Sequence, residues 1–317
     1  MINRLVVTAV LLSSFGLAQQ PATTPSPFGL DPSAASANVT EQRVPVSKSD
    51  IYCAGYISKQ TVNRENFVAG GLQSPHTTRF VDRDIVFLRG SGYQPGTLVS
   101  IVREWKNPDR FDLYKGASKL LKETGQPYQD IAYARVIELR GTDTAVAQME
   151  FGCESVVPGD LVVPFVERSS VTVRQSTTLD RFPGEKPSVE GKIVLARDGD
   201  QLITTGRKVY LNVGLDKGVK VGDYLRVTRG YTPDETDEAD AATLKSTVMD
   251  DTQKNAPKFP NNKLKELPRR VLGEVVVIGA TPDSSTAMVT FMLEEMHVGD
   301  AVELEAPQQE PQTPGTH

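Results

Sequence analysis

The sequence is poor in the residue patterns that build reactive sites. It has three histidines, His76, His297 and His317, which lie far apart in the chain. It has no H-E-x-x-H zinc motif, no G-x-S-x-G nucleophile elbow and no Walker glycine loop, so enzyme classes that depend on those motifs are excluded. The sequence therefore predicts no catalytic residue, no metal site and no cofactor. A hydrolase whose acids converge only in the fold stays open as an alternative, because such carboxylates need no fixed spacing.

The chain has no long apolar run after its first residues. It also has no excess of positive charge. No later stretch approaches the roughly 18 apolar residues that a membrane span needs. The formal net charge is −5, with 35 Lys+Arg against 40 Asp+Glu. Nucleic acids and anionic lipid surfaces both favour a basic partner. We therefore expect no nucleic-acid partner, and no membrane span once the leader is removed.

Residues 1–18 have the pattern of a secretory signal peptide. Arg4 is followed by the apolar stretch LVVTAVLLSSFGLA, in which Gly16 and Ala18 are the small residues that a signal peptidase prefers. We expect cleavage after residue 18 and export to the periplasm or to the outside of the cell. An uncleaved membrane anchor is the alternative.

The chain has only two cysteines, Cys53 and Cys153. In an oxidising compartment a lone pair of cysteines most simply forms one disulfide. Redox-active pairs are closely spaced, whereas these two are separated by about a third of the chain. A structural disulfide is therefore predicted, with a pair of free thiols or a redox pair as the alternative.

Almost everything between two Pro-, Ala-, Ser- and Thr-rich arms reads as short strands. The arms, residues 19–46 and 306–317, hold too little apolar surface to fold and are expected to be a disordered tether and tail. Between them, β-branched runs such as DIVFLRG and TAVAQMEF are bounded by Gly, Pro and Asp, as strands are. The pattern breaks at TTLDRFPGEKPS and then resumes. We predict an all-β fold with module 1 at residues 47–168, a linker at 169–188 and module 2 at 189–305.

The two modules read as a tandem repeat of one small β-barrel or sandwich. AGYIS near Gly55 aligns with EGKIV near Gly191, and DIVFLRGSGYQPGTLVSIVR aligns with RKVYLNVGLDKGVKVGDYLRVTR. Each module has one long inserted excursion after the matched Arg, residues 104–130 and residues 230–269. Within the first excursion, residues 113–123 have the apolar spacing of a helix.

Glycine turns precede four of the expected strands. A strand that leaves a tight turn needs a residue at positive φ, which glycine supplies without strain. An adjacent aspartate can accept hydrogen bonds from the backbone amides of the turn itself. This structural role, rather than metal binding or acid catalysis, is predicted for Gly96, Gly159, Asp160, Gly222, Asp223, Gly299 and Asp300.

Four stretches of module 2 carry a family resemblance: VYLNVG at 209–214, GVKVGDYLRVTR at 218–229, LGEVVV at 272–277 and STAMV at 285–289. With them the module resembles the C-terminal β domain of the flagellar assembly protein T. It is also similar to related modules that follow LysM domains in bacterial envelope proteins. The resemblance implies a small β-barrel with non-enzymatic, scaffold-type work in the bacterial envelope.

The first excursion holds the candidate interaction surface. Aromatic and basic side chains together can stack on sugar rings or anchor a partner protein, and here they are Trp105, Lys106, Arg110, Phe111, Tyr114 and Tyr128. The competing interpretation is that Trp105 and Phe111 plug the open end of the first barrel.

We therefore expect an exported scaffold or interaction protein that contacts envelope proteins through its two modules. A binder of cell-wall glycan or peptidoglycan that uses the Trp105 region is the first alternative, and the hydrolase is the second.

Overall fold

The computed structural model describes residues 43–304 apart from 75, 77, 107, 109–115, 175–178, 183–186, 201, 231–262, 264 and 265. All described residues belong to one compact unit, which begins at Glu41. The predicted leader, most of the tether, most of the second excursion and the tail lie outside this part of the chain. Within it, no helix is both long enough and apolar enough to cross a membrane.

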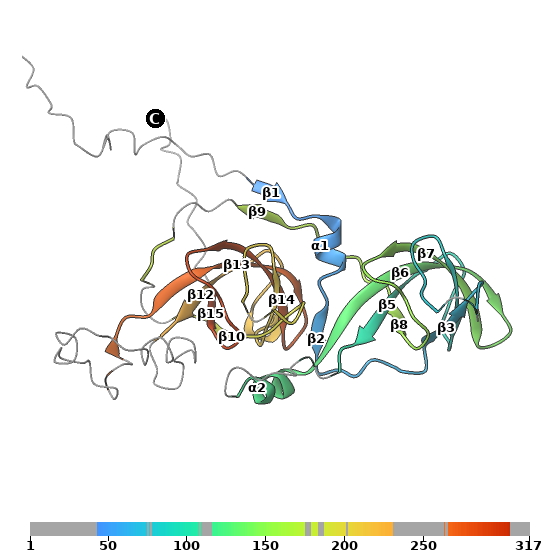
Figure 1. Ribbon diagram of the computed structural model, residues 1–317, viewed down its shortest axis with the longest axis horizontal. Helices are drawn as coiled ribbons and strands as arrows, with labels where there is room; N and C mark the ends of the chain where they lie inside the picture. The colour runs from blue at the N-terminus through green and yellow to red at the C-terminus, as the bar shows by residue number, and fades with distance from the viewer. Residues whose placement is uncertain are drawn as a thin grey trace, which may run out of the picture. The chain divides into compact units, whose positions relative to one another are not determined.

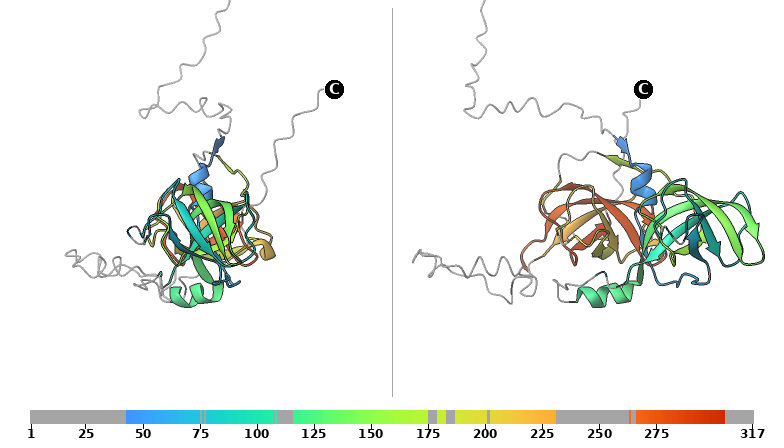
Figure 2. Two further views of the ribbon diagram at one scale, coloured as in Figure 1. Left: turned by 90° about the vertical axis from the view of Figure 1, so that its right-hand side faces the viewer. Right: turned by 45° about the vertical axis from the view of Figure 1, so that its right-hand side comes forward.

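Module 1 is a closed six-stranded antiparallel barrel with one additional strand (Figure 1). Its strands are β2 (Tyr56–Ser58), β3 (Phe67–Gly71), β4 (Ile85–Arg89), β5 (Leu98–Glu104), β6 (Gln126–Arg140), β7 (Thr144–Gly152) and β8 (Leu161–Pro164). The barrel order is β3-β4-β7-β6-β5-β8, and β8 returns to β3. β2 pairs with the first residues of β6, beyond the stretch that β7 occupies. The left view of Figure 2 shows the strands of this module arranged as a ring.

Module 2 is a closed barrel with the same topology. Its strands are β10 (Glu190–Ala196), β11 (Lys208–Leu211), β12 (Tyr224–Arg229), β13 (Arg270–Ala280), β14 (Ser285–Met292) and β15 (Ala301–Leu304). They pair in the order β10-β11-β14-β13-β12-β15, which repeats the order of module 1 strand for strand. The prediction of an all-β fold built from two tandem barrel modules is confirmed.

The repeat extends to irregularities in the strands. The register of β5 on β6 shifts between Ile101 and Val102, and that of β12 on β13 shifts between Val227 and Thr228. One part of the sequence alignment was wrong, because the strand equivalent to β10 is β3 and not the AGYIS segment. That segment forms β2, which stands outside the barrel ring.

The four turn glycines take the backbone conformation expected of them, with φ between 86° and 101° at Gly96, Gly159, Gly222 and Gly299. The aspartate role is confirmed too. The carboxylates of Asp160, Asp223 and Asp300 accept hydrogen bonds from backbone amides three residues earlier, at 2.8, 2.8 and 2.7 Å. These turns are therefore shaped locally by glycine and aspartate, as the sequence pattern indicates.

Two of these aspartates also bind an arginine, which the sequence analysis did not foresee. The Nε and Nη2 atoms of Arg103, on β5, donate to the two carboxylate oxygens of Asp160 at 2.8 Å each. In module 2 the same atoms of Arg229, on β12, donate to Asp300 at 2.7 and 2.8 Å. The hydrogen bond to Asp160 raises the pKa of Arg103. Each bidentate pair joins one strand to the turn that starts the next strand in the ring, and so helps to close the barrel.

Each barrel has its own apolar core, formed by alternate residues of its strands. The core of module 1 includes Val68, Val86, Leu88, Ile101, Ala134, Val136, Ala147 and Met149. The core of module 2 includes Ile193, Val209, Leu211, Leu225, Val227, Val275, Val277, Ala287 and Val289.

Two short strands outside the barrels lie in stretches where disorder or a linker was expected. β1 (Arg43–Pro45), at the end of the predicted tether, pairs antiparallel with β9 (Thr172–Arg174) in the predicted linker. The structure also has α1 (Lys48–Tyr52), α2 (Ala117–Thr124) and the 3₁₀ helix η2 (Leu215–Lys217). α2 overlaps the helix expected at residues 113–123, of which residues 113–115 lie outside the described part.

The arginine pairs lead to a matched test. Asp160→Asn and Asp300→Asn keep an oxygen for the turn amide but remove the charge that faces a partly buried arginine. We expect each to lower the free energy of unfolding by about 2–3 kcal/mol. Asp223→Asn is the control, because the described contact of that carboxylate is with its own turn, and it should change stability by less than about 0.5 kcal/mol. Urea unfolding measures all three, and equal losses would contradict the closing role of the arginine pairs.

Candidate interaction surface

Trp105 follows β5 and lies at the contact between the two modules. Its amide donates to the Pro127 carbonyl at 3.0 Å, and its carbonyl accepts from the Gln126 side chain at 2.9 Å. Its half-buried ring packs against a cluster that contains Val194, Leu195 and Tyr210 of module 2. The ring is not part of the core of the first barrel. The plug interpretation is therefore wrong for Trp105, whose ring joins the modules instead.

The other predicted members of the surface are spread over different environments. Tyr128 is 2% exposed and stacks on Tyr56 at a centroid distance of 5.3 Å, so its ring is not available to a partner. Lys106 is exposed. Arg110, Phe111 and Tyr114 lie outside the described residues.

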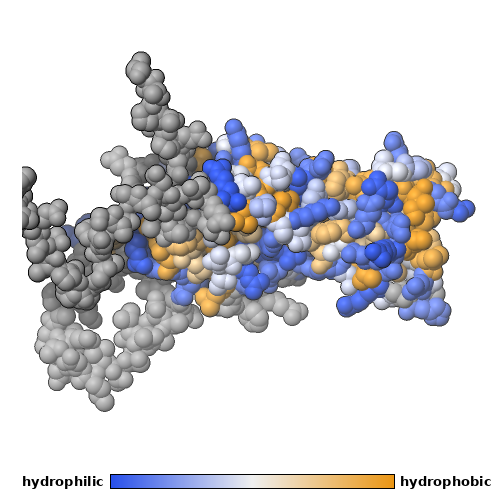
Figure 3. Space-filling model, turned by 90° about the horizontal axis from the view of Figure 1, so that it is seen from above, coloured by the Kyte–Doolittle hydropathy of each residue, from blue (hydrophilic) through white to orange (hydrophobic). Residues whose placement is uncertain are grey.

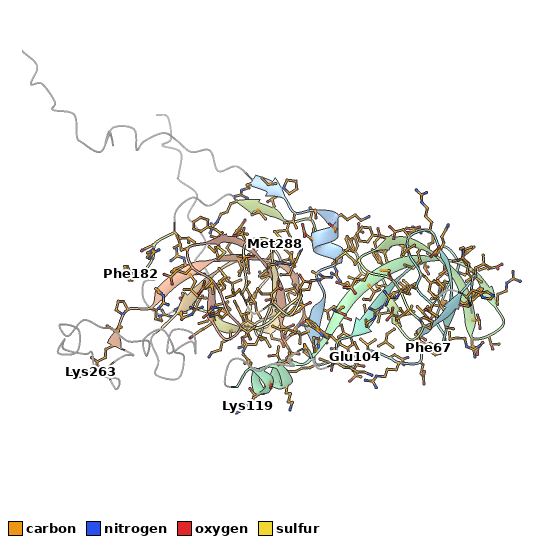
Figure 4. All side chains as sticks on the ribbon, viewed as in Figure 1. Phe67, Glu104, Lys119, Phe182, Lys263 and Met288 are labelled. Carbon is orange, nitrogen blue, oxygen red and sulfur yellow. A yellow bond between two sulfur atoms is a disulfide. The ribbon has the colours of Figure 1, made fainter. Side chains whose placement is uncertain are left out.

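The described end of the first excursion also contacts module 2. α2 packs Leu121 into the same cluster as Trp105, next to Leu195 of β10. A hollow of about 250 Å³ lies beside this helix, and its lining includes Lys119 and Glu123 of α2 and Lys192 of β10. Figure 4 labels Lys119 on the helix. The first excursion therefore covers part of the joint between the barrels.

A segment for which sequence analysis predicted no contact with module 2 also lies at the joint. We call residues 47–58, which include α1 and β2, the docking segment. Four hydroxyl groups of module 2 donate to its backbone carbonyls, and the longest of these bonds runs from Thr281 to Ile57 at 3.3 Å. Tyr210 donates to Ala54 at 2.9 Å, Thr286 donates to Gly55 at 2.9 Å, and Ser284 donates to Ile57 at 2.7 Å. The Lys208 ammonium pairs with the Asp50 carboxylate.

Gly55 is the residue that allows this close approach. Its φ is +72°, and a Cβ there would lie 2.4 Å from the Tyr210 hydroxyl oxygen and 2.8 Å from the Tyr128 carbonyl oxygen. A side chain would therefore be strained by its backbone conformation and would also push the modules apart.

The docking segment is equally firmly attached to module 1. The predicted disulfide is confirmed and joins Cys53, at the end of α1, to Cys153 after β7. The buried Asp130 carboxylate accepts from the Gly55 amide at 2.7 Å and from two nitrogens of Arg168 at 2.7 and 2.8 Å. Arg168 also donates to the Ile51 carbonyl at 2.7 Å. One short stretch of chain thus binds both barrels.

The linker adds a second layer over module 2. Val171 and Ala54 pack with Val276 and Ile278 of β13, and Val173 borders this cluster. The guanidinium of Arg174 lies 4.1 Å above the Tyr224 ring and pairs with the fully buried Glu274.

One sequence signal could have revealed that this face is covered. The run VLGEVVVIG in β13 is buried on both faces, and a continuous apolar strand is typical of burial on both sides.

Among the described residues, no three His, Cys, Asp or Glu side chains gather as metal ligands would. His297 lies 3.1 Å from Arg229 through Nδ1, His76 is remote from it in the chain, and His317 lies outside the described part. No protein-family model matches the sequence, and no curated protein matches it significantly.

Trp105→Ala tests the joint. Because the half-buried ring fills space between modules, its removal should lower the free energy of unfolding by about 2–3 kcal/mol, less than for a fully buried tryptophan. Lys106→Ala, at the neighbouring exposed position, is the control and should change stability by less than about 0.5 kcal/mol. Chemical unfolding followed by circular dichroism measures both, and equal small effects would contradict the packing role.

Alkaline pH tests the buried hydroxyl. Burial raises the pKa of Tyr210 above its usual 10.0. The neutral form is thus favoured in the folded state, so its stabilisation is complete below pH 10 and is lost as pH rises above that value. In Tyr210→Phe the decline of unfolding free energy above pH 10 should be shallower by up to about 1.4 kcal/mol per pH unit. Parallel pH profiles for the two proteins would contradict the burial of this hydroxyl.

Proposed function

We propose that this chain is an exported, non-enzymatic scaffold or interaction protein of a bacterial cell envelope. It acts through protein–protein contacts made by its two β modules. The observation that carries the proposal is the docking segment, which holds two barrels of the same topology in one compact unit. A fixed pair of binding modules presents two surfaces at a set spacing without the entropy cost of ordering a flexible linker.

The chemistry of the described residues supports this function. The aspartates of the repeated turns are engaged by turn amides, and two of them also by arginine. The disulfide suits an oxidising compartment such as the periplasm. Trp105, which a glycan binder would use, has its ring against Tyr210 and Leu195 rather than free for a sugar. We therefore place the binding surfaces on the barrels themselves.

Affinity capture with crosslinking tests the proposal. Tagged mature chain is crosslinked in its native envelope, and the partners are identified by mass spectrometry. Gly55→Ala is compared with Gly141→Ala, because both glycines have positive φ but only Gly55 faces another module, whereas Gly141 faces open space. Wild type and Gly141→Ala should recover the same small set of envelope proteins, and Gly55→Ala should lose at least part of it.

Two results would overturn the proposal. Recovery of cell-wall material alone, with sedimentation of the chain on purified sacculi, would indicate a glycan binder. Hydrolysis of murein or simple polysaccharides by the purified chain would indicate an enzyme.

A further inference from the structure

The two modules present equivalent outer faces. In module 1, Phe87 of β4 pairs with Val146 of β7, and in module 2, Tyr210 of β11 pairs with Thr286 of β14. The adjacent strands β6 and β13 each shift register at the matching place, at Ile137 and at Ile278. The shared topology therefore makes Phe87 the counterpart of Tyr210, Val146 that of Thr286, and Ile137 that of Ile278.

The described residues of the chain cover only one of these faces. In module 2 the docking segment and the linker leave Tyr210 0% exposed and Ile278 1% exposed. In module 1 the matching face is open to solvent. Ile137 is 47% exposed, and Phe87 is half-buried. Figure 3 shows apolar side chains gathered at the module 1 end of the described surface.

The chemistry of the open face differs from that of its covered counterpart. Where module 2 has the polar groups of Lys208, Tyr210 and Thr286, module 1 has Ile85, Phe87 and Val146. An outer barrel strand that faces only water is usually polar, so this apolar set favours burial. It has no hydroxyl to donate to backbone carbonyls, and it therefore suits an apolar side chain.

The described chain carries a matching projection on module 2. In module 1 the strand β2 lies on the side that contacts module 2. It runs beside the start of β6 and places Ile57 in the contact. At the start of β13, residues 181 and 182 run in a comparable place, and the Val271 amide donates to the Arg181 carbonyl at 2.8 Å. The next side chain, Phe182, is 58% exposed and is labelled in Figure 4.

We propose that the open face of module 1, formed by Ile85, Phe87, Ile137 and Val146, binds the Phe182 side of module 2 in a second copy of this chain. The contact reproduces between copies the joint that already holds the two barrels of one chain. Because the two surfaces differ, the association is head-to-tail, and it continues into open chains unless the rotation closes a ring. The proposal does not depend on which envelope proteins the chain contacts.

The charges around both surfaces favour a second copy over a nucleic acid or an anionic membrane. Arg135 lies on the open face itself, in one row with Gln148 and Ile85, and it pairs with Glu150. The pairs Arg89–Asp143 and Arg140–Glu138 lie at the end of the same strands. Beside Phe182, Arg181 and Arg270 both pair with Glu294. The arginines named here are thus paired with carboxylates, whereas phosphate groups favour basic side chains whose charge is not neutralised.

Analytical ultracentrifugation of the full exported chain tests this proposal, over roughly 1–100 μM to span a micromolar Kd. The variants are Ile137→Lys and Phe182→Lys, and the control is Val166→Lys, because Val166 is 69% exposed and outside both surfaces. Wild type and control should gain mass with concentration. Each variant should stay monomeric at concentrations where wild type associates, and its circular dichroism should be unchanged.

A mixture of the two variants makes the test specific. Each variant keeps one intact surface, so an equimolar mixture should form dimers that stop at two chains. A monomeric wild type, variants that associate as wild type does, or a mixture that stays monomeric would each overturn the proposal. So would a self-association that Ile137→Lys removes and Phe182→Lys leaves intact, since that pattern indicates two open faces packed on each other.

Discussion

The structure depends on the backbone carbonyls of the docking segment finding hydrogen-bond donors. Buried carbonyls without partners are strongly unfavourable. Ala54, Gly55 and Ile57 receive their donors from side chains of module 2, while Asp130 and the disulfide hold the same stretch on module 1. Neither module completes this part of its surface alone. The contact is therefore part of the fold rather than an accessory to two independent barrels.

The two barrels contain the same arginine–aspartate interaction although their sequences differ. The pairs Arg103–Asp160 and Arg229–Asp300 use the same guanidinium nitrogens. In each case the second nitrogen also donates to a backbone carbonyl of the preceding turn, at Ser155 or Glu295. Arginine satisfies a carboxylate and a carbonyl together because its donors are fixed in one plane. The same carboxylate also accepts a hydrogen bond from a backbone amide of its turn. The ion pair therefore connects the strand that carries the arginine to that turn.

A structural feature could be predicted from the sequence when the residues that determine it lie close together in the chain. The strands, the turn glycines and the turn aspartates depend on residues within a few positions, and they were predicted correctly. The disulfide followed from having only two cysteines. The joint could not be predicted in this way. Gly55 and Gly191 both precede an alternating run, yet Gly55 gives clearance to Tyr210, whereas a Cβ at Gly191 would meet Val213 of its own barrel. Likewise, nothing in the local pattern of Trp105 shows that its neighbours are in module 2.

The two modules contact each other through different surfaces. A different surface therefore remains exposed on each module. Module 1 uses its β2 side to cover the β11–β14 face of module 2. Its own β4–β7 face and the far side of module 2 are not covered in this way by the residues that the structure describes. Contiguous exposed apolar side chains are typical of interaction sites, and Ile137 lies beside the paired residues Phe87 and Val146 on the β4–β7 face. At the position in module 2 that is equivalent to Ile137, Ile278 is 1% exposed because Ala54 and Val171 pack against it. The asymmetry of the joint thus accounts for where apolar side chains remain on the surface of module 1.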